Sequence, residues 1–416
     1  MTADDELVAH IVERASSPGY EAWWAKVSNT GYCSTPVHLH GQTPAGYGLR
    51  ILTRCKNRRA AVCPSCSALY SGDTWQLVHQ GIHPCNADTG QEPVMVFATL
   101  TAPSYGPVHT TAEHHTVCRP GNPMRCEHGR SQRCLAVHGA NDPQLGEPLC
   151  IDCYRYLDQV LFTWHAPQLW HRFTITLRRL VKRHDQEARV SYVKVVELQR
   201  RGVPHFHAVV RLDNTTLTTA DLIALGHRAI RSTSLDVPAI GGELLTLRFG
   251  PQTDLRPLIP GSGTEDRRIA SYLAKYVTKS VTEFGLSPRR ISPRAVTELA
   301  VRPHIRSILV TITWVAQETD DPDMTKWLHT LGYRGHITTK TRAYSTTMGA
   351  LRAQRAAWRQ QQGNTANEVM RGWEFTKIGH DNDGDRVLAA TADAQHRAAR
   401  QAAREALTDR VDHEPG

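Results

Sequence analysis

The amino-acid sequence predicts an α+β protein, because strand-like and helix-like segments are both strongly marked in it. Strands are indicated by β-rich composition at residues 94–101, 190–199 and 205–212. The last two are separated only by the turn at 200–204 and should pair as a hairpin. Amphipathic helical patterns cover residues 154–183 and 264–279. The first of these is one helix, or two helices broken near Pro167.

The chain has 416 residues, which is enough for two or three domains with a sizeable core. Its 49 Lys and Arg against 40 Asp and Glu give a net charge of +9. The excess is concentrated in residues 172–211, with ten basic and three acidic residues, and in residues 285–360, with twelve and five. Such basic blocks favour nucleic acid as the partner; solvated surface is the alternative.

Two features favour a cytoplasmic protein without a membrane partner. No apolar run approaches the roughly 18 residues of a membrane span. The acidic N-terminal sequence is not that of a signal peptide. In that compartment the ten cysteines are expected to be metal ligands rather than disulfides.

The N-terminal region, residues 1–90, is predicted to hold a helix followed by a zinc-binding module. Its four candidate ligands are Cys33, Cys55, Cys63 and Cys66. The last two form a Cys-Pro-Ser-Cys knuckle, and four thiolates make a tetrahedral set for zinc. The basic residues Lys56, Arg58 and Arg59 lie between the ligands, where they would stabilise thiolates and could meet phosphate. The alternative is that these cysteines are buried free thiols.

A second cysteine cluster occupies a loop-rich insertion at about residues 103–155. Its members are Cys118, Cys126, Cys134, Cys150 and Cys153. Together with His128 they exceed the needs of one tetrahedral site. We therefore expect Cys150, Cys153 and two of the other three cysteines to hold a second structural zinc. Cys85 has no evident partner.

Two histidines mark the strand that follows the turn. His205 and His207 are separated by one residue, and side chains alternate across a strand, so both imidazoles lie on one face and can share one ion. Neutral imidazoles are good ligands for divalent metals. Glu197, on the preceding strand of the hairpin, is the candidate third ligand; the alternative is a surface glutamate.

The helix at residues 264–279 has two different faces. Its apolar stripe is formed by Ile269, Leu273, Val277, Val281 and Phe284. A neighbouring stripe is formed by Tyr272, Lys275, Tyr276 and Lys279, at i, i+3, i+4 and i+7. A phenol can attack a phosphodiester that a metal polarises, and lysines one turn away would stabilise the phenolate. Tyrosines at this spacing are alternatively core residues.

Three segments in this order, at residues 97–101, 204–207 and 272–279, look like motifs one, two and three of the HUH rolling-circle replication initiators. From about residue 30 to about residue 360, the chain resembles the replication initiators of actinobacterial, Streptomyces-type plasmids and integrative elements. The resemblance implies the HUH endonuclease fold, a central antiparallel β-sheet flanked by helices. The histidine hairpin would lie in its middle with the tyrosine helix against it. The zinc-binding modules would be insertions, which antiparallel connections tolerate.

The resemblance also implies a chemistry. His205 and His207 would hold Mg²⁺ or Mn²⁺ against the scissile phosphate. Tyr276 would attack and keep the 5′-phosphate as a phosphotyrosine, and Tyr272 would serve the second transfer, although the two roles could be reversed. The partners would be single-stranded and origin DNA with the host helicase and polymerase, since no Walker A pattern appears in the sequence.

The part of the chain after an endonuclease domain at residues 91–285 is expected to bind DNA. Residues 286–380 would form a basic DNA-binding region and residues 381–416 a helical tail. The candidate DNA contacts are Arg200, Arg201, Arg211, Arg334, Lys340 and Arg342. Two other functions remain open: a relaxase or transposase of the same superfamily, and a non-catalytic, zinc-dependent DNA-binding regulator.

Overall fold

The computed structural model describes residues 2–42, 47–83, 92–111, 117–121, 124–259, 264–278, 281–287, 289–361 and 371–411. It divides the chain into two compact units. The larger unit comprises residues 74–348, and the smaller unit combines residues 1–73 with residues 349–416. These boundaries differ from the ranges expected from the sequence, because both ends of the chain enter the same unit.

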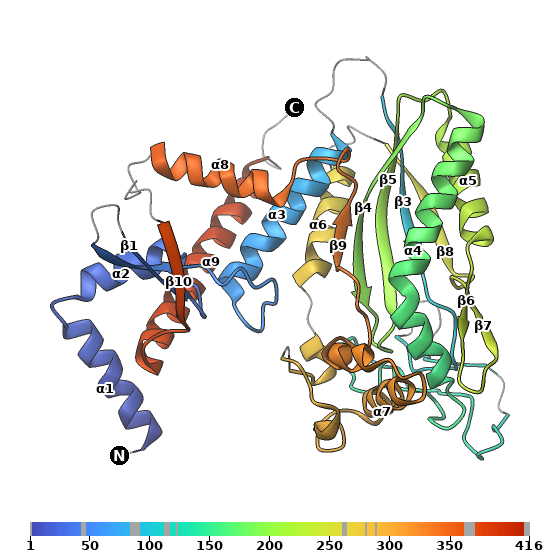
Figure 1. Cartoon of the computed structure of the whole chain (residues 1–416), viewed down its shortest axis with the longest axis horizontal. Coiled ribbons are helices and arrows are strands. Elements are labelled where there is room, and N and C mark those ends of the chain that lie inside the picture. The colour runs from blue at the N-terminus through green and yellow to red at the C-terminus, as the bar shows by residue number, and fades with distance from the viewer. Residues whose placement is uncertain are drawn as a thin grey trace. The chain divides into compact units, whose positions relative to one another are not determined.

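A five-stranded sheet in the order β8–β3–β5–β4–β9 forms the centre of the larger unit (Figure 1). Its strands are β3 (Val94–Leu100), β4 (Arg189–Leu198), β5 (Pro204–Asp213), β8 (Thr253–Leu258) and β9 (Thr338–Lys340). All neighbouring strands run antiparallel, and β5 has a partner on each side. The predicted central antiparallel sheet, with the histidine strand in its middle, is therefore confirmed.

The β4–β5 hairpin closes through a tight turn. Gly202 has a φ of +77°, which suits glycine because it has no Cβ. Its amide donates to the Gln199 carbonyl at 2.7 Å, and the Gln199 amide donates to the Val203 carbonyl at 2.9 Å. The resulting register sets Glu197 directly opposite His205, as the sequence predicts.

Helices cover both faces of this sheet. The helices of the larger unit are the C-terminal part of α3 (Pro64–Ile82), α4 (Tyr156–His184), α5 (Thr219–Ser232), α6 (Thr264–Thr278) and α7 (Pro303–Glu318). The helix α4 continues through Pro167 rather than breaking there. Phe206 of β5 stacks on Trp170 of α4, with the ring centroids 5.5 Å apart. Because side chains alternate, His207 faces the opposite side, where it meets α6.

Residues 286–348 do not form a separate basic region but part of the larger unit. The helix α7 buries an apolar face formed by Ile305, Ile308, Leu309, Ile312 and Val315. This face belongs to a second hydrophobic core, shared with Leu161 and Trp164 of α4 and with Leu328 of the 3-10 segment η3 (Pro322–Thr330). The five apolar residues recur at helical spacing, so the sequence does indicate a helix with a buried face here, although the segment is basic overall.

The smaller unit is built from both ends of the chain. Its elements are α1 (Ala3–Ser16), α2 (Tyr20–Asn29), β1 (Val37–Gln42), β2 (Gly48–Thr53), the start of α3, α8 (Met348–Gln361), β10 (Arg371–Ile378) and α9 (Asp383–Val411). The strand β10 pairs antiparallel with β1 in a three-stranded sheet of order β10–β1–β2. A strand pair this far apart in sequence leaves no local sequence signal.

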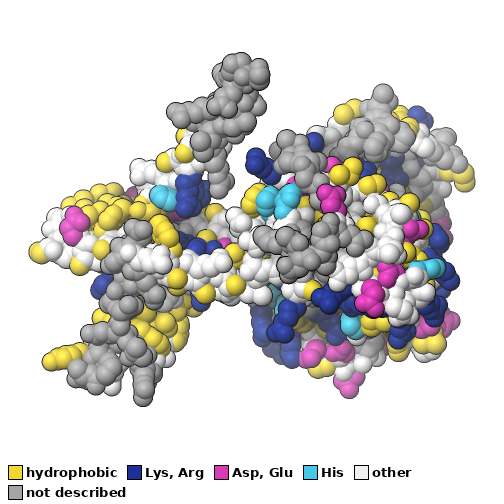
Figure 2. All heavy atoms as spheres, turned by 90° about the horizontal axis from the view of Figure 1, so that it is seen from above, with side chains coloured by type: hydrophobic (Ala, Val, Ile, Leu, Met, Phe, Trp, Pro, Cys, Tyr) yellow, Lys and Arg dark blue, Asp and Glu magenta, His cyan; other side chains and the backbone are white. Residues whose placement is uncertain are grey.

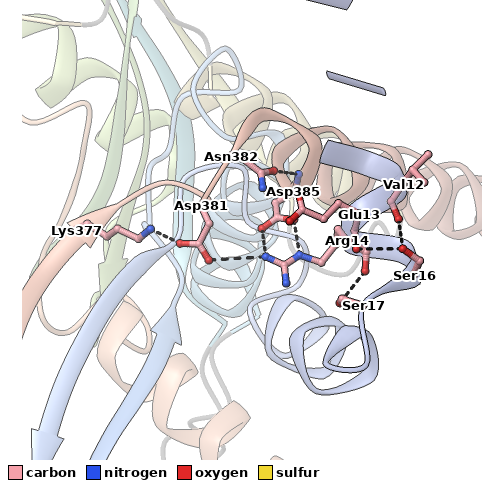
Figure 3. A network of polar contacts seen from close by, with 9 residues as sticks. All are labelled: Val12, Glu13, Arg14, Ser16, Ser17, Lys377, Asp381, Asn382 and Asp385. Carbon is pink, nitrogen blue, oxygen red and sulfur yellow. Dashed lines mark hydrogen bonds and ion pairs between the residues drawn. The ribbon is translucent and has the colours of Figure 1, made fainter. Parts of the chain in front are cut away.

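A polar network joins α1 to α9 within this unit (Figure 3). The Arg14 guanidinium donates to both carboxylate oxygens of Asp385, at 2.6 and 2.8 Å. The Asp385 side chain is fully buried, and its backbone amide donates to Asn382. Asp381 lies 4.0 Å from Arg14 and also pairs with Lys377. The start of the predicted tail is therefore packed against α1.

Charged side chains are unevenly distributed over the surface of the larger unit. Lys and Arg side chains gather along one side of the larger unit in the space-filling view, where Asp and Glu side chains also lie (Figure 2). None of the described helices combines the length and the apolar composition needed to cross a bilayer.

Candidate functional site

His205 and His207 share one face of the central sheet, as side-chain alternation requires. Their ring centroids are 4.5 Å apart, and His207 is only 3% exposed. The Thr99 hydroxyl on β3 lies 3.4 Å from His207 Nδ1, and the Gln199 amide nitrogen lies 3.3 Å from His205 Nδ1. The Thr99 hydroxyl can accept the Nδ1 proton of His207, which leaves Nε2 of that ring as the nitrogen for a metal.

Glu197 lies beside these histidines, with its Oε2 3.6 Å from His207 Nε2. The hairpin therefore brings together the three residues that are predicted from the sequence as ligands of one ion. Within the described residues, however, the ligand atoms of His205, His207 and Glu197 do not form a group in which every pair lies within 4.8 Å. Glu197 as third ligand stays a prediction.

The helix α6 places both tyrosines over the histidine face. The Tyr272 hydroxyl lies 3.4 Å from His207 Nε2, and the Tyr276 ring stacks on the His207 ring with centroids 5.4 Å apart. The two tyrosine rings are 4.7 Å apart. Leu273 and Val277 are buried while Lys275 is exposed, so the apolar and polar stripes of the helix are separate as predicted. Lys279 lies outside the described residues.

Burial sets the protonation states of the site. Burial, helped by His207, lowers the pKa of His205 to about 4, so this imidazole is neutral at physiological pH. Burial raises the pKa of Tyr276 above its ordinary value, and a hydrogen bond with Tyr272 and the charge of Glu197 raise it further. The Tyr276 phenol is therefore protonated at neutral pH and requires added positive charge, or a proton acceptor, to become a nucleophile.

The predicted DNA contacts divide into exposed and structural residues. Arg200 and Arg342 are exposed. Arg201 is half-buried and donates to the Ala102 and Pro103 carbonyls at 3.2 and 3.0 Å. The Arg334 guanidinium lies 4.3 Å above the Trp164 ring centroid. Lys340, on β9, donates to the carbonyls of Thr341 and Ser345.

Arg211 is a correction to the predicted set. It is 3% exposed, and its guanidinium donates to the carbonyls of Gly81, Ala343 and Tyr344 and pairs with Asp213 at 2.8 Å. It lies on the same face of β5 as His205 and His207, where other elements cover the sheet. A phosphate cannot reach this side chain.

The four cysteines of the N-terminal module converge in the smaller unit. The sulfur atoms of Cys33, Cys55, Cys63 and Cys66 all lie within 4.8 Å of one another. Cys33 is 3.7 Å from both Cys63 and Cys66. Tetrahedral zinc with Zn–S bonds of about 2.3 Å requires S–S edges of about 3.8 Å. The set therefore has the dimensions of a structural zinc site.

The insertion of the larger unit holds two converging groups rather than the one expected. The first is His109, Cys118, Cys134 and His138, and the second is Cys126, His128, Cys150 and Cys153. The expectation of two cysteines added to Cys150 and Cys153 was wrong, because Cys118 and Cys134 pair with histidines instead. His109 and His138 were missed; the Cys-x3-His spacing of Cys134 and His138 is the signal that could have found His138.

Comparison with known proteins gives one family. The family model RepSA, described as replication initiator protein, pSAM2, matches residues 19–394. A replication initiator protein from Streptomyces ambofaciens is 36% identical over 465 residues, covering 99% of this chain and 98% of its own length. No solved structure matches.

Proposed function

The chain belongs to the RepSA family of replication initiator proteins, and we propose that it initiates replication by nicking and rejoining one DNA strand at its origin. The observation that supports this most is the Tyr272 hydroxyl, 3.4 Å from His207 Nε2, with Tyr276 stacked on the same imidazole. Two phenols, two imidazoles and a carboxylate on one surface suit phosphodiester transfer.

His205, His207 and Glu197 fit Mg²⁺ or Mn²⁺ by the chemistry of their donor atoms. The Thr99 hydroxyl contacts Nδ1 of His207, and His205 is neutral at physiological pH. The ion, when bound, would polarise the scissile phosphate and supply the positive charge that a phenol of raised pKa requires.

Tyr276 is the proposed first nucleophile. Its phenolic oxygen loses a proton and bonds to phosphorus as the P–O3′ bond breaks, and the departing 3′ oxygen takes up a proton. The protein then holds the 5′-phosphate as a phosphotyrosine, and the free 3′-hydroxyl primes synthesis. Tyr272, one helical turn away, would make the second attack that ends the round. A second attack would explain why two tyrosines lie on the same stripe of the helix.

The remaining partners follow from this role. The host helicase would unwind the duplex, and the host polymerase would extend the 3′ end. In the smaller unit, Arg54, Lys56 and Arg352 line a cavity of about 350 Å³ beside Cys66, which suits the phosphates of origin DNA. Arg200 and Arg342 are the exposed contacts proposed for the larger unit.

A covalent adduct tests the nicking proposal. The protein is incubated with Mn²⁺ and a single-stranded oligonucleotide from its own origin, and denaturing electrophoresis detects an adduct. We expect the wild-type protein to form it and the double variant Y272F/Y276F to form none.

The single variants assign the roles. Loss of the adduct in Tyr276→Phe but not in Tyr272→Phe supports Tyr276 as first nucleophile, and the reverse result exchanges the two roles. Origin binding without any adduct from the wild-type protein would favour a non-catalytic DNA-binding regulator.

A further inference from the structure

The first metal-binding group of the insertion lies next to the turn of the histidine hairpin. We propose that His109, Cys118, Cys134 and His138 bind a structural zinc ion that positions this turn, and through it His205. The proposal deepens the proposed function, on which it rests only in treating His205 as a ligand of the catalytic metal. Its zinc and hairpin readouts need no DNA cleavage, so the two can fail separately.

The distances between the ligand atoms fit a tetrahedral ion. His109 Nδ1 and His138 Nε2 are 3.1 Å apart, Cys134 Sγ is 3.5 Å from His138 Nε2, and Cys118 Sγ is 3.9 Å from His109 Nδ1. Bonds of about 2.0–2.1 Å to nitrogen and 2.3 Å to sulfur give edges of about 3.4 Å for N–N and 3.6 Å for N–S. Cys118 and His138 are buried, as structural ligands usually are.

A second contact fixes the orientation of His138. Its Nδ1 lies 2.7 Å from Asp142 Oδ2, so the proton of a neutral imidazole is held on Nδ1. The lone pair of Nε2 then points at His109 and the two sulfurs. Metal-binding histidines in proteins commonly donate their other N–H to a carboxylate in this way. The Thr110 amide, at 3.3 Å, donates to Cys118 Sγ and would stabilise a thiolate.

The ligand His109 is tied by its backbone to the loop that touches the hairpin. Its amide donates to the Glu147 carbonyl at 2.8 Å, and its carbonyl accepts from the Gly146 amide at 2.9 Å. Gly146 in turn packs on the backbone of Arg200: a Cβ at Gly146 would lie 2.5 Å from the Arg200 carbonyl. Gly146 also has a φ of +85°. The contact therefore exists only because this residue is glycine.

Two arginines add to this contact. Arg302 donates to the carbonyls of Pro143 and Leu145 at 2.9 Å each, and to the Arg200 carbonyl at 3.2 Å. The Arg200 guanidinium donates back to the Ala140 carbonyl at 2.6 Å. The loop between the ligand His138 and Glu147 is thus joined to the hairpin turn from both sides.

The turn is connected to the histidine site by Gln199. Its side-chain oxygen accepts from Arg201 Nε at 3.2 Å, and its amide nitrogen lies 3.3 Å from His205 Nδ1. A displaced turn would move Gln199 and change the orientation of the His205 ring. His205 is the residue positioned, and the zinc ligands act on it only through the turn.

The test compares ligand, rescue and contact variants of the full-length protein. Zinc content is measured by mass spectrometry, hydrogen exchange is followed at residues 198–207, and Mn²⁺ affinity is measured by electron paramagnetic resonance. The wild-type protein should carry three zinc ions, one for each converging group. His138→Ala should carry two, exchange faster at the hairpin and bind Mn²⁺ about tenfold more weakly. His138→Cys should restore all three properties.

Gly146→Ala distinguishes the effect of the metal from the effect of the contact between the loop and Arg200. It should keep three zinc ions yet show the fast hairpin exchange, because the added Cβ pushes the loop off Arg200. Cys153→Ser, in the other group of the insertion, should lose one zinc ion and leave the hairpin protected. These two variants decide the case if His138→Ala does not fold.

Two results overturn the proposal. His138→Ala with a full zinc content means that His138 is not a ligand. The second result is wild-type hairpin exchange, either in His138→Ala that has lost one zinc ion or in Gly146→Ala with its altered contact. It would mean that the metal orders only the insertion. If the wild-type protein binds no Mn²⁺ at the histidines, the proposed chemistry fails, and the exchange data still test the role of zinc.

Discussion

Side-chain alternation along β5 decides what each of its residues can do. It directs His205 and His207 to the face covered by α6, and Phe206 to the core under α4. Arg211 lies on the histidine face as well, four residues further along, where its guanidinium meets three backbone carbonyls. Positive charge in the sequence therefore indicates DNA contact only outside such covered strands.

Substitution of Arg211 should destabilise the protein rather than weaken DNA binding. Arg211→Ala removes the cation that pairs with Asp213 and a donor from three carbonyls, so we expect the free energy of unfolding to fall by about 2–4 kcal/mol. Chemical denaturation measures this. The control Arg342→Ala, at an exposed position, should change stability by less than about 0.5 kcal/mol. A stable Arg211→Ala variant that has lost origin affinity would contradict the buried role.

Substitution of His205 should separate cleavage from binding. Metal polarisation of a phosphate is worth several kcal/mol, so His205→Ala should slow Mn²⁺-dependent cleavage by about 100-fold or more. Cleavage of a labelled origin oligonucleotide measures the rate, and a gel-shift assay with duplex origin DNA serves as the control. Loss of duplex binding in this variant would mean that the histidine is structural.

At the scale of elements, the hairpin β4–β5 carries a buried charge on the face opposite the histidines. Lys194 is 3% exposed, lies over the rings of Phe206 and Trp170, and donates to the His336 carbonyl at 3.3 Å. Burial lowers the pKa of its ammonium to about 7. The hairpin is thus more stable when this lysine is neutral.

The stability of the protein should consequently rise between pH 7 and pH 10.5. Over this range Lys194 binds a proton in the unfolded chain, where its pKa is 10.5, but not in the folded protein. Unfolding therefore takes up a proton, and the free energy of unfolding increases with pH by on the order of a few kcal/mol. Lys194→Met should flatten this increase, as measured by urea denaturation across the range. An unchanged slope in Lys194→Met would assign the effect to other groups.

At the scale of the whole molecule, the smaller unit is discontinuous in sequence. Its sheet joins β1 to β10, and α1 is held to α9 by the Arg14–Asp385 pair. Between these segments the chain forms the entire larger unit. The four-cysteine group lies in the smaller unit, and the two groups of the insertion lie in the larger one.

Loss of one metal group should therefore affect one unit only. A structural zinc contributes about 10–16 kcal/mol in small zinc-binding peptides, which is comparable with the whole stability of a domain. Cys33→Ser should abolish the unfolding transition of the smaller unit in scanning calorimetry and leave that of the larger unit in place. Cys153→Ser is the reciprocal control and should lower only the transition of the larger unit. If each variant lost the transitions of both units at once, the two units would unfold together.

The sequence by itself determined the features that depend on local periodicity and on neighbouring residues. The shared face of His205 and His207, the register of Glu197 and the two stripes of α6 follow from alternation, a short turn and helical spacing. The four-cysteine group was also predictable, because its knuckle is local and it holds all but one of the cysteines that precede the sheet.

Only the tertiary structure decided which distant segments meet. It brought His109 and Cys118 to Cys134 and His138, joined β10 to β1, and covered Arg211. These contacts depend on where chain segments far apart in sequence are brought by packing, which composition and periodicity do not encode. The same holds for the contact of Gly146 with Arg200, which connects the insertion to the histidine hairpin.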